Sequence, residues 1–126
     1  MSQKKSIVVI EDDKNIAQAE KIILEREFSV NVAHDGKEGL DLAQQLKPDV
    51  VILDIMMPKL SGYDVCKAIR ASPDLNHTKI IMVTAKDRQI DELHGMDLGA
   101  DDYIMKPFEP EELRHVVHQV LKEQLE

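Results

Sequence analysis

The sequence predicts an α/β fold, a doubly wound (βα)5 three-layer sandwich in which helices cover both faces of a parallel sheet. Five short apolar runs alternate along the chain with segments of helical periodicity. Most of these runs are apolar on both sides, which is typical of strands buried in a parallel sheet. The 126 residues are enough for one such domain and too few for two, so we expect a single domain over residues 1–126.

The five apolar runs are the expected strands. They are Ile7 to Ile10, Ser29 to Ala33, Val50 to Leu53, Ile80 to Val83 and Tyr103 to Met105. Turn residues such as His34-Asp35-Gly36 and Lys47-Pro48-Asp49 separate them from the helical segments. Parallel strands are joined by right-handed crossovers. The second run is followed by none of the carboxylate, hydroxyl or ammonium side chains that follow the other four; it ends in Ala33 and His34. We therefore expect the second strand at an edge of the sheet and the strand order 2-1-3-4-5.

Helical periodicity is clearest near the end of the chain. Its apolar stripe consists of Leu113, Val116, Val117, Val120 and Leu121. Pro110, Glu111 and Glu112 mark the start of this helix. A similar stripe near the beginning consists of Ile16, Ala19, Ile22 and Ile23. Asp13 is the expected N-cap of that first helix. Further helices are expected around Leu40 to Leu46, around Val65 to Ile69 and, from a weaker pattern, from Ile90 to Leu98.

The composition excludes several classes of protein. Acidic residues outnumber basic ones by 24 to 16, the net charge is −8 and no basic stripe stands out, so direct binding to nucleic acid is not expected. The longest apolar runs are too short to span a membrane or to form a signal peptide, so we expect a cytoplasmic protein without a membrane partner. The single cysteine, Cys66, cannot form an internal disulfide and is expected to be a packed thiol.

Polar side chains suited to chemistry follow four of the five expected strands. They are Glu11, Asp12 and Asp13 after the first strand, Asp54 after the third, Thr84 after the fourth and Lys106 after the fifth. Taken singly, each has an ordinary explanation as a helix cap, a turn residue or a loop residue. Parallel strands bring them to one edge of the sheet, however, where the mutual repulsion of the carboxylates calls for a cation. Oxygen ligands without an accompanying histidine or cysteine favour Mg²⁺.

A metal beside a carboxylate and a lysine suits phosphate chemistry. Asp54 can attack phosphorus to give an acyl phosphate, while Lys106 and the metal balance the charge on the phosphoryl oxygens. Thr84 can donate a hydrogen bond to one of those oxygens. An ionised carboxylate needs no general base, so no histidine is required in the site.

Four motifs occur in order along most of the chain. They are Ile7-Val8-Val9-Ile10-Glu11-Asp12-Asp13, the segment from Pro48 to Pro58 around Asp54, Val83-Thr84-Ala85, and the segment from Gly99 to Phe108 around Lys106. With these motifs the chain resembles the receiver domains of bacterial and archaeal two-component response regulators from about Ser6 to Leu121. The resemblance implies a flavodoxin-like fold and a phosphoryl group received from a sensor histidine kinase or a phosphotransfer protein.

The resemblance also implies a role for each acid. Asp54 is the phospho-acceptor, and Glu11 and Asp12 are the acidic pair that binds Mg²⁺ together with Asp54 and the backbone carbonyl of Met56. Three acids stand in a row, so Asp12 and Asp13 are an alternative pair. Family spacing favours Glu11 with Asp12.

The same resemblance implies that Thr84 and Lys106 contact the phosphoryl group and that a cis peptide bond joins Lys106 to Pro107. Tyr103 is the implied switch, an aromatic ring that turns inward as Thr84 moves toward the phosphoryl group; a half-buried aromatic on a strand is an equally good reading of its position. A further hypothesis is that Lys86 reaches toward the phosphoryl group. Phosphorylation then shifts the population of a signalling face formed by the fourth helix, the fifth strand and the fifth helix.

The expected partners are the phosphodonor and an unknown output protein or domain, and the chain is expected to be a monomer or a phosphorylation-dependent dimer. No enzymatic activity is expected beyond self-phosphorylation and slow self-dephosphorylation. One alternative is an Mg²⁺-dependent phosphatase or phosphotransferase, disfavoured because Ile55-Met56-Met57-Pro58 follow Asp54 where such enzymes carry a second acid. Another is a receiver-like interaction module without phosphotransfer, which the intact set of polar residues disfavours. A receiver taken from a longer regulator also fits the sequence.

Overall fold

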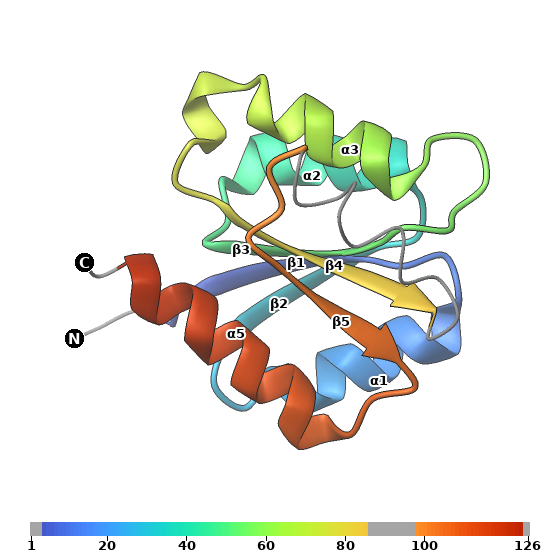
Figure 1. Ribbon diagram of the computed structural model, residues 1–126, viewed down its shortest axis with the longest axis vertical. Coiled ribbons are helices and arrows are strands. Elements are labelled where there is room, and N and C mark those ends of the chain that lie inside the picture. The colour runs from blue at the N-terminus through green and yellow to red at the C-terminus, as the bar shows by residue number, and fades with distance from the viewer. Residues whose placement is uncertain (1–3, 86–97, 125–126) are drawn as a thin grey trace.

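The computed structural model describes residues 4–85 and 98–124 and contains a five-stranded sheet with helices on both faces (Figure 1). The strands are β1 (Ser6–Ile10), β2 (Ser29–Ala33), β3 (Val50–Asp54), β4 (Lys79–Ala85) and β5 (Asp102–Lys106). The helices are α1 (Lys14–Leu24), α2 (Gly36–Leu46), α3 (Gly62–Arg70), the short 3₁₀ helix η1 (Pro73–Leu75) and α5 (Pro110–Gln124). Lys86 and, apart from Leu98, the predicted helix at 90–98 fall outside the described residues.

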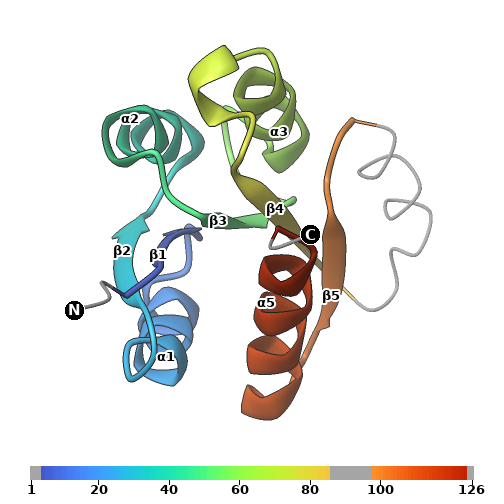
Figure 2. The same ribbon diagram turned by 90° about the vertical axis from the view of Figure 1, so that its left-hand side faces the viewer.

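All pairs of neighbouring strands are parallel, and the strand order is β2-β1-β3-β4-β5. Helices α1 and α5 cover one face of the sheet, and α2 and α3 cover the other (Figure 2). This arrangement confirms the predicted doubly wound α/β fold and its strand order. Strands β3, β4 and β5 each continue one or two residues beyond the predicted ends. Asp54 and Lys106 are therefore the last residues of their strands, and Thr84 is the last but one of β4.

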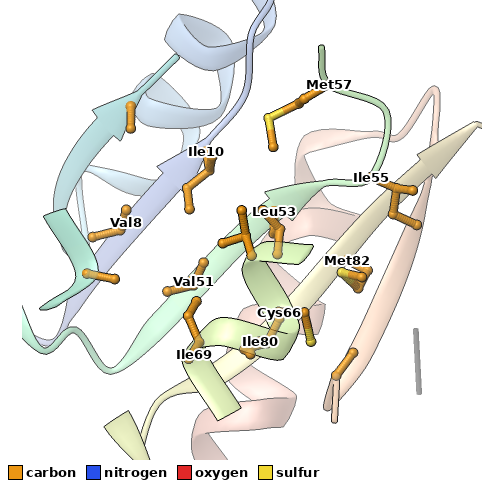
Figure 3. Packing of buried hydrophobic residues seen from close by; sticks show 14 of the residues in the cluster. Val8, Ile10, Val51, Leu53, Ile55, Met57, Cys66, Ile69, Ile80 and Met82 are labelled. Atoms are coloured by element: carbon orange, nitrogen blue, oxygen red, sulfur yellow. The ribbon is translucent and has the colours of Figure 1, made fainter. Parts of the chain in front are cut away.

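Two hydrophobic clusters hold the layers together, because alternate side chains of a strand point to opposite faces. Val8 and Ile10 of β1 belong to the cluster under α2 and α3, which Figure 3 shows at close range. Ile7 and Val9 belong to the cluster under α1 and α5. Cys66 is fully buried in the first cluster, which confirms that it is a packed thiol.

Capping residues fix where the helices begin. The Asp13 carboxylate accepts hydrogen bonds from the backbone N–H groups of Asn15 and Ile16, so Asp13 is the N-cap of α1 as predicted. Helix α5 begins at Pro110, and the predicted apolar stripe of this helix faces the sheet. Its buried members are Leu113, Val117, Val120 and Leu121.

The predicted apolar face of α1 was wrong in part. The buried residues of this helix are Ala17, Glu20 and Leu24, whereas Ile22 is 56% exposed. Two overlapping stripes fit a helical spacing in this segment, and the choice between them depends on packing against β1, β2 and α5 rather than on hydrophobicity alone. The stripe that packs inward carries a glutamate in its centre.

The chain enters β5 through a network around Arg70 at the end of α3. Its guanidinium donates hydrogen bonds to the carbonyl oxygens of Gly99, Leu75 and Thr78 and to the Asp101 carboxylate, at 2.9, 3.3, 2.6 and 3.0 Å. The Asp101 carboxylate also accepts from the backbone N–H of Ile80, at the start of β4. The network therefore ties α3 to the beginnings of β4 and β5, and it sets the course of the strand that ends at Lys106.

Within the residues that the structure describes, no helix combines the length and the apolar character that crossing a membrane requires.

Candidate functional site

The candidate site lies at the carboxyl edge of the sheet, where β1, β3, β4 and β5 end. Glu11 follows β1 directly, Asp54 and Lys106 end β3 and β5, and Thr84 is the penultimate residue of β4. Because the strands are parallel, residues far apart in the sequence meet at this edge. The Lys106 ammonium and the Glu11 carboxylate, which are 95 residues apart, form a hydrogen bond.

An acidic cluster occupies this edge. Glu11, Asp12 and Asp54 each offer a carboxylate oxygen, and these three oxygens lie within 4.8 Å of one another. Glu11 is only 1% exposed and Asp54 only 6% exposed, whereas Asp12 is exposed. Asp13 points its carboxylate into the first turn of α1 instead. Of the two acidic pairs that the sequence leaves open, the geometry groups Glu11 with Asp12.

Lys106 supplies the positive charge of the site. Its Nζ lies 2.9 Å from Glu11 Oε1 and 3.5 Å from Asp54 Oδ2. Burial disfavours the charged ammonium, but the hydrogen bond to Glu11 and the charge of Asp54 outweigh it and raise the pKa of Lys106. The lysine is therefore charged at neutral pH and bridges the ends of β1 and β3.

Burial disfavours the ionised form of both carboxyls, Glu11 and Asp54. Burial raises the pKa of Glu11 to about 7, although the hydrogen bond from Lys106 lowers it, and the nearby charge of Asp54 adds to the rise. Burial also raises the pKa of Asp54, against the charge of Lys106. One ammonium thus compensates two buried carboxyls only in part, and the site favours additional positive charge.

The loop after Asp54 is held close to the end of β3. The Met56 N–H donates to Asp54 Oδ1 at 3.3 Å, and Met56 itself is exposed. Gly62, the first residue of α3, packs against this turn so closely that a Cβ atom would collide with the backbone carbonyl oxygen of Asp54. Only glycine fits there without displacing the end of β3.

Thr84 and Tyr103 occupy different depths. Thr84 is buried, and its hydroxyl donates to the Ala85 carbonyl oxygen over a long 3.4 Å. Tyr103, three residues before Lys106, is partly buried and packs against the cluster under α2 and α3. On the neighbouring strand β4 it pairs with Met82. The peptide bond between Lys106 and Pro107 is cis, the geometry that the resemblance implied.

Sequence reasoning missed Glu20. Its side chain is 1% exposed, and burial, together with the charges of Glu11 and Asp54, raises its pKa to about 8. The available signal was its spacing, since Glu20 lies three residues after Ala17 and four before Leu24, the two buried apolar residues of α1.

A flavodoxin-like sheet with acids, a threonine and a lysine at its carboxyl edge is the arrangement that the receiver resemblance implied. A family model for the response regulator receiver domain matches residues 7–118, so the chain belongs to that family. It is a receiver domain of two-component response regulators. A phospho-accepting role for this chain is consistent with the response regulators to which it is related.

Curated relatives include a transcriptional regulatory protein of alkaline phosphatase synthesis, PhoP, from Bacillus subtilis. It is 42% identical over 119 residues, which are 94% of this chain and 49% of PhoP. The DNA-binding response regulator MtrA from Mycolicibacterium smegmatis is 41% identical over 89% of this chain and 48% of MtrA. The chain thus spans about half the length of the curated relatives it matches.

Solved structures show the same fold. The chemotaxis response regulator CheY4 of Vibrio cholerae superposes with a TM-score of 0.88 at 30% sequence identity. The match covers 94% of this chain and 99% of the CheY4 chain.

Proposed function

We propose that Asp54 is the phospho-acceptor of this receiver domain. The observation that carries the proposal is the surroundings of its carboxylate, which is almost fully buried, 3.5 Å from the Lys106 ammonium and grouped with two further acids. An oxygen of Asp54 forms a bond to phosphorus while the bond between phosphorus and the donor breaks, and the leaving group keeps the electron pair. Lys106 compensates the charge of the phosphoryl oxygens.

Mg²⁺ is the proposed cofactor, and the residues fit it. Glu11, Asp12 and Asp54 present oxygen ligands within one ion's reach of one another, with no cysteine or histidine among them. The raised pKa of Glu11 supports the fit, because buried carboxyls compensated by a single lysine gain from a cation. Glu11, Asp12, Asp54 and the backbone carbonyl of Met56 would hold the ion, which would neutralise negative charge on the acids and on an incoming phosphoryl group.

Thr84 and Tyr103 are the proposed link to the signalling face. The Thr84 hydroxyl makes one long hydrogen bond and can turn to donate to a phosphoryl oxygen, and Tyr103 lies on the neighbouring strand beside Met82. Phosphorylation supplies differential energy that favours one arrangement of β5 and α5 over another. The fourth helix of the proposed signalling face is outside the described residues.

The phosphodonor is proposed to be a sensor histidine kinase or a phosphotransfer protein, and the whole of residues 1–126 is proposed to act as one domain. Relatives of about twice the length include a DNA-binding response regulator, so an attached or separate output module is the proposed contact with DNA. With a net charge of −8, this domain itself is not expected to bind DNA. We place it in the cytoplasm, as a monomer or a phosphorylation-dependent dimer, without enzymatic activity beyond its own phosphorylation and dephosphorylation.

The test is intact mass spectrometry after incubation with acetyl phosphate, with and without Mg²⁺. The wild type is expected to gain one phosphoryl group only when Mg²⁺ is present, and Asp54→Asn is expected to gain none. Asp41→Asn, which neutralises an exposed acid of α2, serves as the control and should behave as the wild type. An adduct that survives in Asp54→Asn would overturn the assignment.

A further inference from the structure

Glu20 is a buried acid for which the site described above has no use. Both of its carboxyl oxygens are inaccessible and, in the described part of the chain, have no hydrogen-bond partner. A buried polar group without a partner destabilises the fold, and a charged one does so far more. If this position served only hydrophobic packing, leucine would stabilise the fold more than glutamate.

Glu20 and Lys106, the lysine of the proposed phosphorylation site, line one hollow of about 450 Å³. It lies between α1 and the chain that leaves β5, and it is lined by Ile16, Ala19, Glu20, Lys106, Pro107 and Phe108. Among these lining residues, only Glu20 and Lys106 are ionisable. The other lining residues are apolar, and the charge of Lys106 lowers the pKa of Glu20.

The charges around Glu20 come from the phosphorylation site. Burial is the main cause that raises its pKa to about 8; Glu11 and Asp54 at the ends of β1 and β3 add to the rise, and Lys106 lowers it.

The other elements packed against α1 contribute little charge near Glu20. Strand β2 has no charged residue. On α5, Arg114 and His118 are paired with the Glu27 carboxylate. The charge of Glu20 therefore responds mainly to the site at Asp54.

We propose that Glu20 is a positioning residue for phosphoryl transfer, acting through Lys106: its neutral carboxyl leaves the lysine to the phosphoryl group, and its ionised carboxylate opposes the reaction. The inference rests on the proposed function of Asp54. An ionised Glu20 adds negative charge beside Lys106, so it attracts the ammonium and repels the incoming phosphoryl oxygens. Glu20 does not touch the reacting atoms.

The chemistry at Asp54 stays balanced. With acetyl phosphate, the bond between phosphorus and the acetyl oxygen breaks, acetate leaves with the electron pair, and the bond from phosphorus to the Asp54 oxygen forms. The phosphoryl group raises the negative charge near Glu20, so its carboxyl takes up a proton from solvent wherever it was ionised before the transfer. By the same linkage, a higher pH disfavours phosphorylation.

The test measures the rate of adduct formation from acetyl phosphate with Mg²⁺ between a pH of about 6 and about 9. We expect the wild-type rate to fall by about fivefold to thirtyfold as Glu20 ionises. Glu20→Gln and Glu20→Leu, which cannot ionise, should lack this fall. Glu25→Gln, at the exposed end of α1, should keep it. The leucine variant guards against a folding defect of the glutamine variant.

The outcomes separate the two proposals. An adduct that forms with the same pH profile in the wild type, Glu20→Gln and Glu20→Leu would overturn the role of Glu20 and leave Asp54 as the acceptor. No adduct in any of these proteins would overturn the proposed function.

A carbon-13 NMR titration of the Glu20 carboxyl needs no phosphoryl transfer. Its midpoint should be lower in Asp54→Asn than in the wild type, because the Asp54 charge raises it. An unchanged midpoint would overturn the coupling between Glu20 and the site.

Discussion

Lys106 is bonded more closely to Glu11 than to the proposed phospho-acceptor. Its Nζ lies 2.9 Å from Glu11 Oε1 and 3.5 Å from Asp54 Oδ2. The cation at the end of β5 thus has two acceptors, on β3 and after β1. A phosphoryl group on Asp54 would add oxygens on the side of the weaker contact, so phosphorylation is expected to draw Lys106 from Glu11 toward Asp54.

Replacing Lys106 with methionine removes the compensating charge of two buried acids. We expect the free energy of unfolding to fall by about 1–3 kcal/mol near pH 8. The pKa values of Glu11 and Asp54 are already raised and would rise further, so the loss should grow with pH as these acids ionise. Urea denaturation near pH 5 and pH 8 measures it, with Lys67→Met on the exposed side of α3 as the control. An equal loss at both pH values would contradict the charge account.

Replacing Glu20 with leucine should stabilise the protein at alkaline pH. The folded chain holds the Glu20 proton up to a pKa of about 8, against 4.5 ordinarily. The stability that this proton contributes is complete below 4.5 and is lost as pH rises through about 8. Between these values the free energy of unfolding should fall by up to about 1.4 kcal/mol per pH unit because of Glu20.

Urea denaturation at a series of pH values should therefore give a flatter curve for Glu20→Leu than for the wild type. The gap between the two should widen up to a pH of about 8 and stay constant above it. Parallel curves would show that Glu20 is not the source of the dependence.

Arg70→Lys should destabilise the fold although it keeps the positive charge. The Arg70 guanidinium serves four acceptors, and an ammonium has neither the planar fork nor the number of donors to replace it. We expect a loss of about 2 kcal/mol in urea denaturation. Lys67→Ala, one turn earlier on the exposed side of α3, should change little. A loss no larger than that of the control would mean that the network is dispensable.

Thr84→Val separates the phosphoryl contact from packing. The Thr84 hydroxyl makes one long hydrogen bond, so the free energy of unfolding should change by less than about 1 kcal/mol. Adduct formation from acetyl phosphate should slow by about fivefold or more, because a donor to the phosphoryl oxygens is lost. Thr78→Val removes a 2.8 Å hydrogen bond to the Pro48 carbonyl oxygen and should do the reverse, lowering stability and leaving the rate unchanged.

The location of the candidate site could be predicted because parallel strands place their carboxyl ends at the same edge of the sheet. Once five strands are recognised, the residues at their carboxyl ends must meet, and Asp54, Thr84 and Lys106 needed only that rule. For the acidic pair the sequence left two choices, of which family spacing favours Glu11 with Asp12. In the structure Glu11 and Asp12 group with Asp54, and Asp13 caps α1.

Two stripes of α1 have helical spacing, and spacing alone does not decide between them. Tertiary packing buries the stripe with Glu20 rather than the one with Ile16 and Ile22. The closer contact of Lys106 with Glu11 likewise depends on side-chain conformation. No spacing in the sequence encodes it.

The most direct test of the central claim is to locate the phosphoryl group. Borohydride reduces an acyl phosphate of aspartate to homoserine, so treating the phosphorylated protein and mapping its peptides identifies the acceptor. We predict homoserine at position 54 and at no other acid, only after incubation with both acetyl phosphate and Mg²⁺. Reduction at Asp12 or Asp13, with Asp54 intact, would contradict the account.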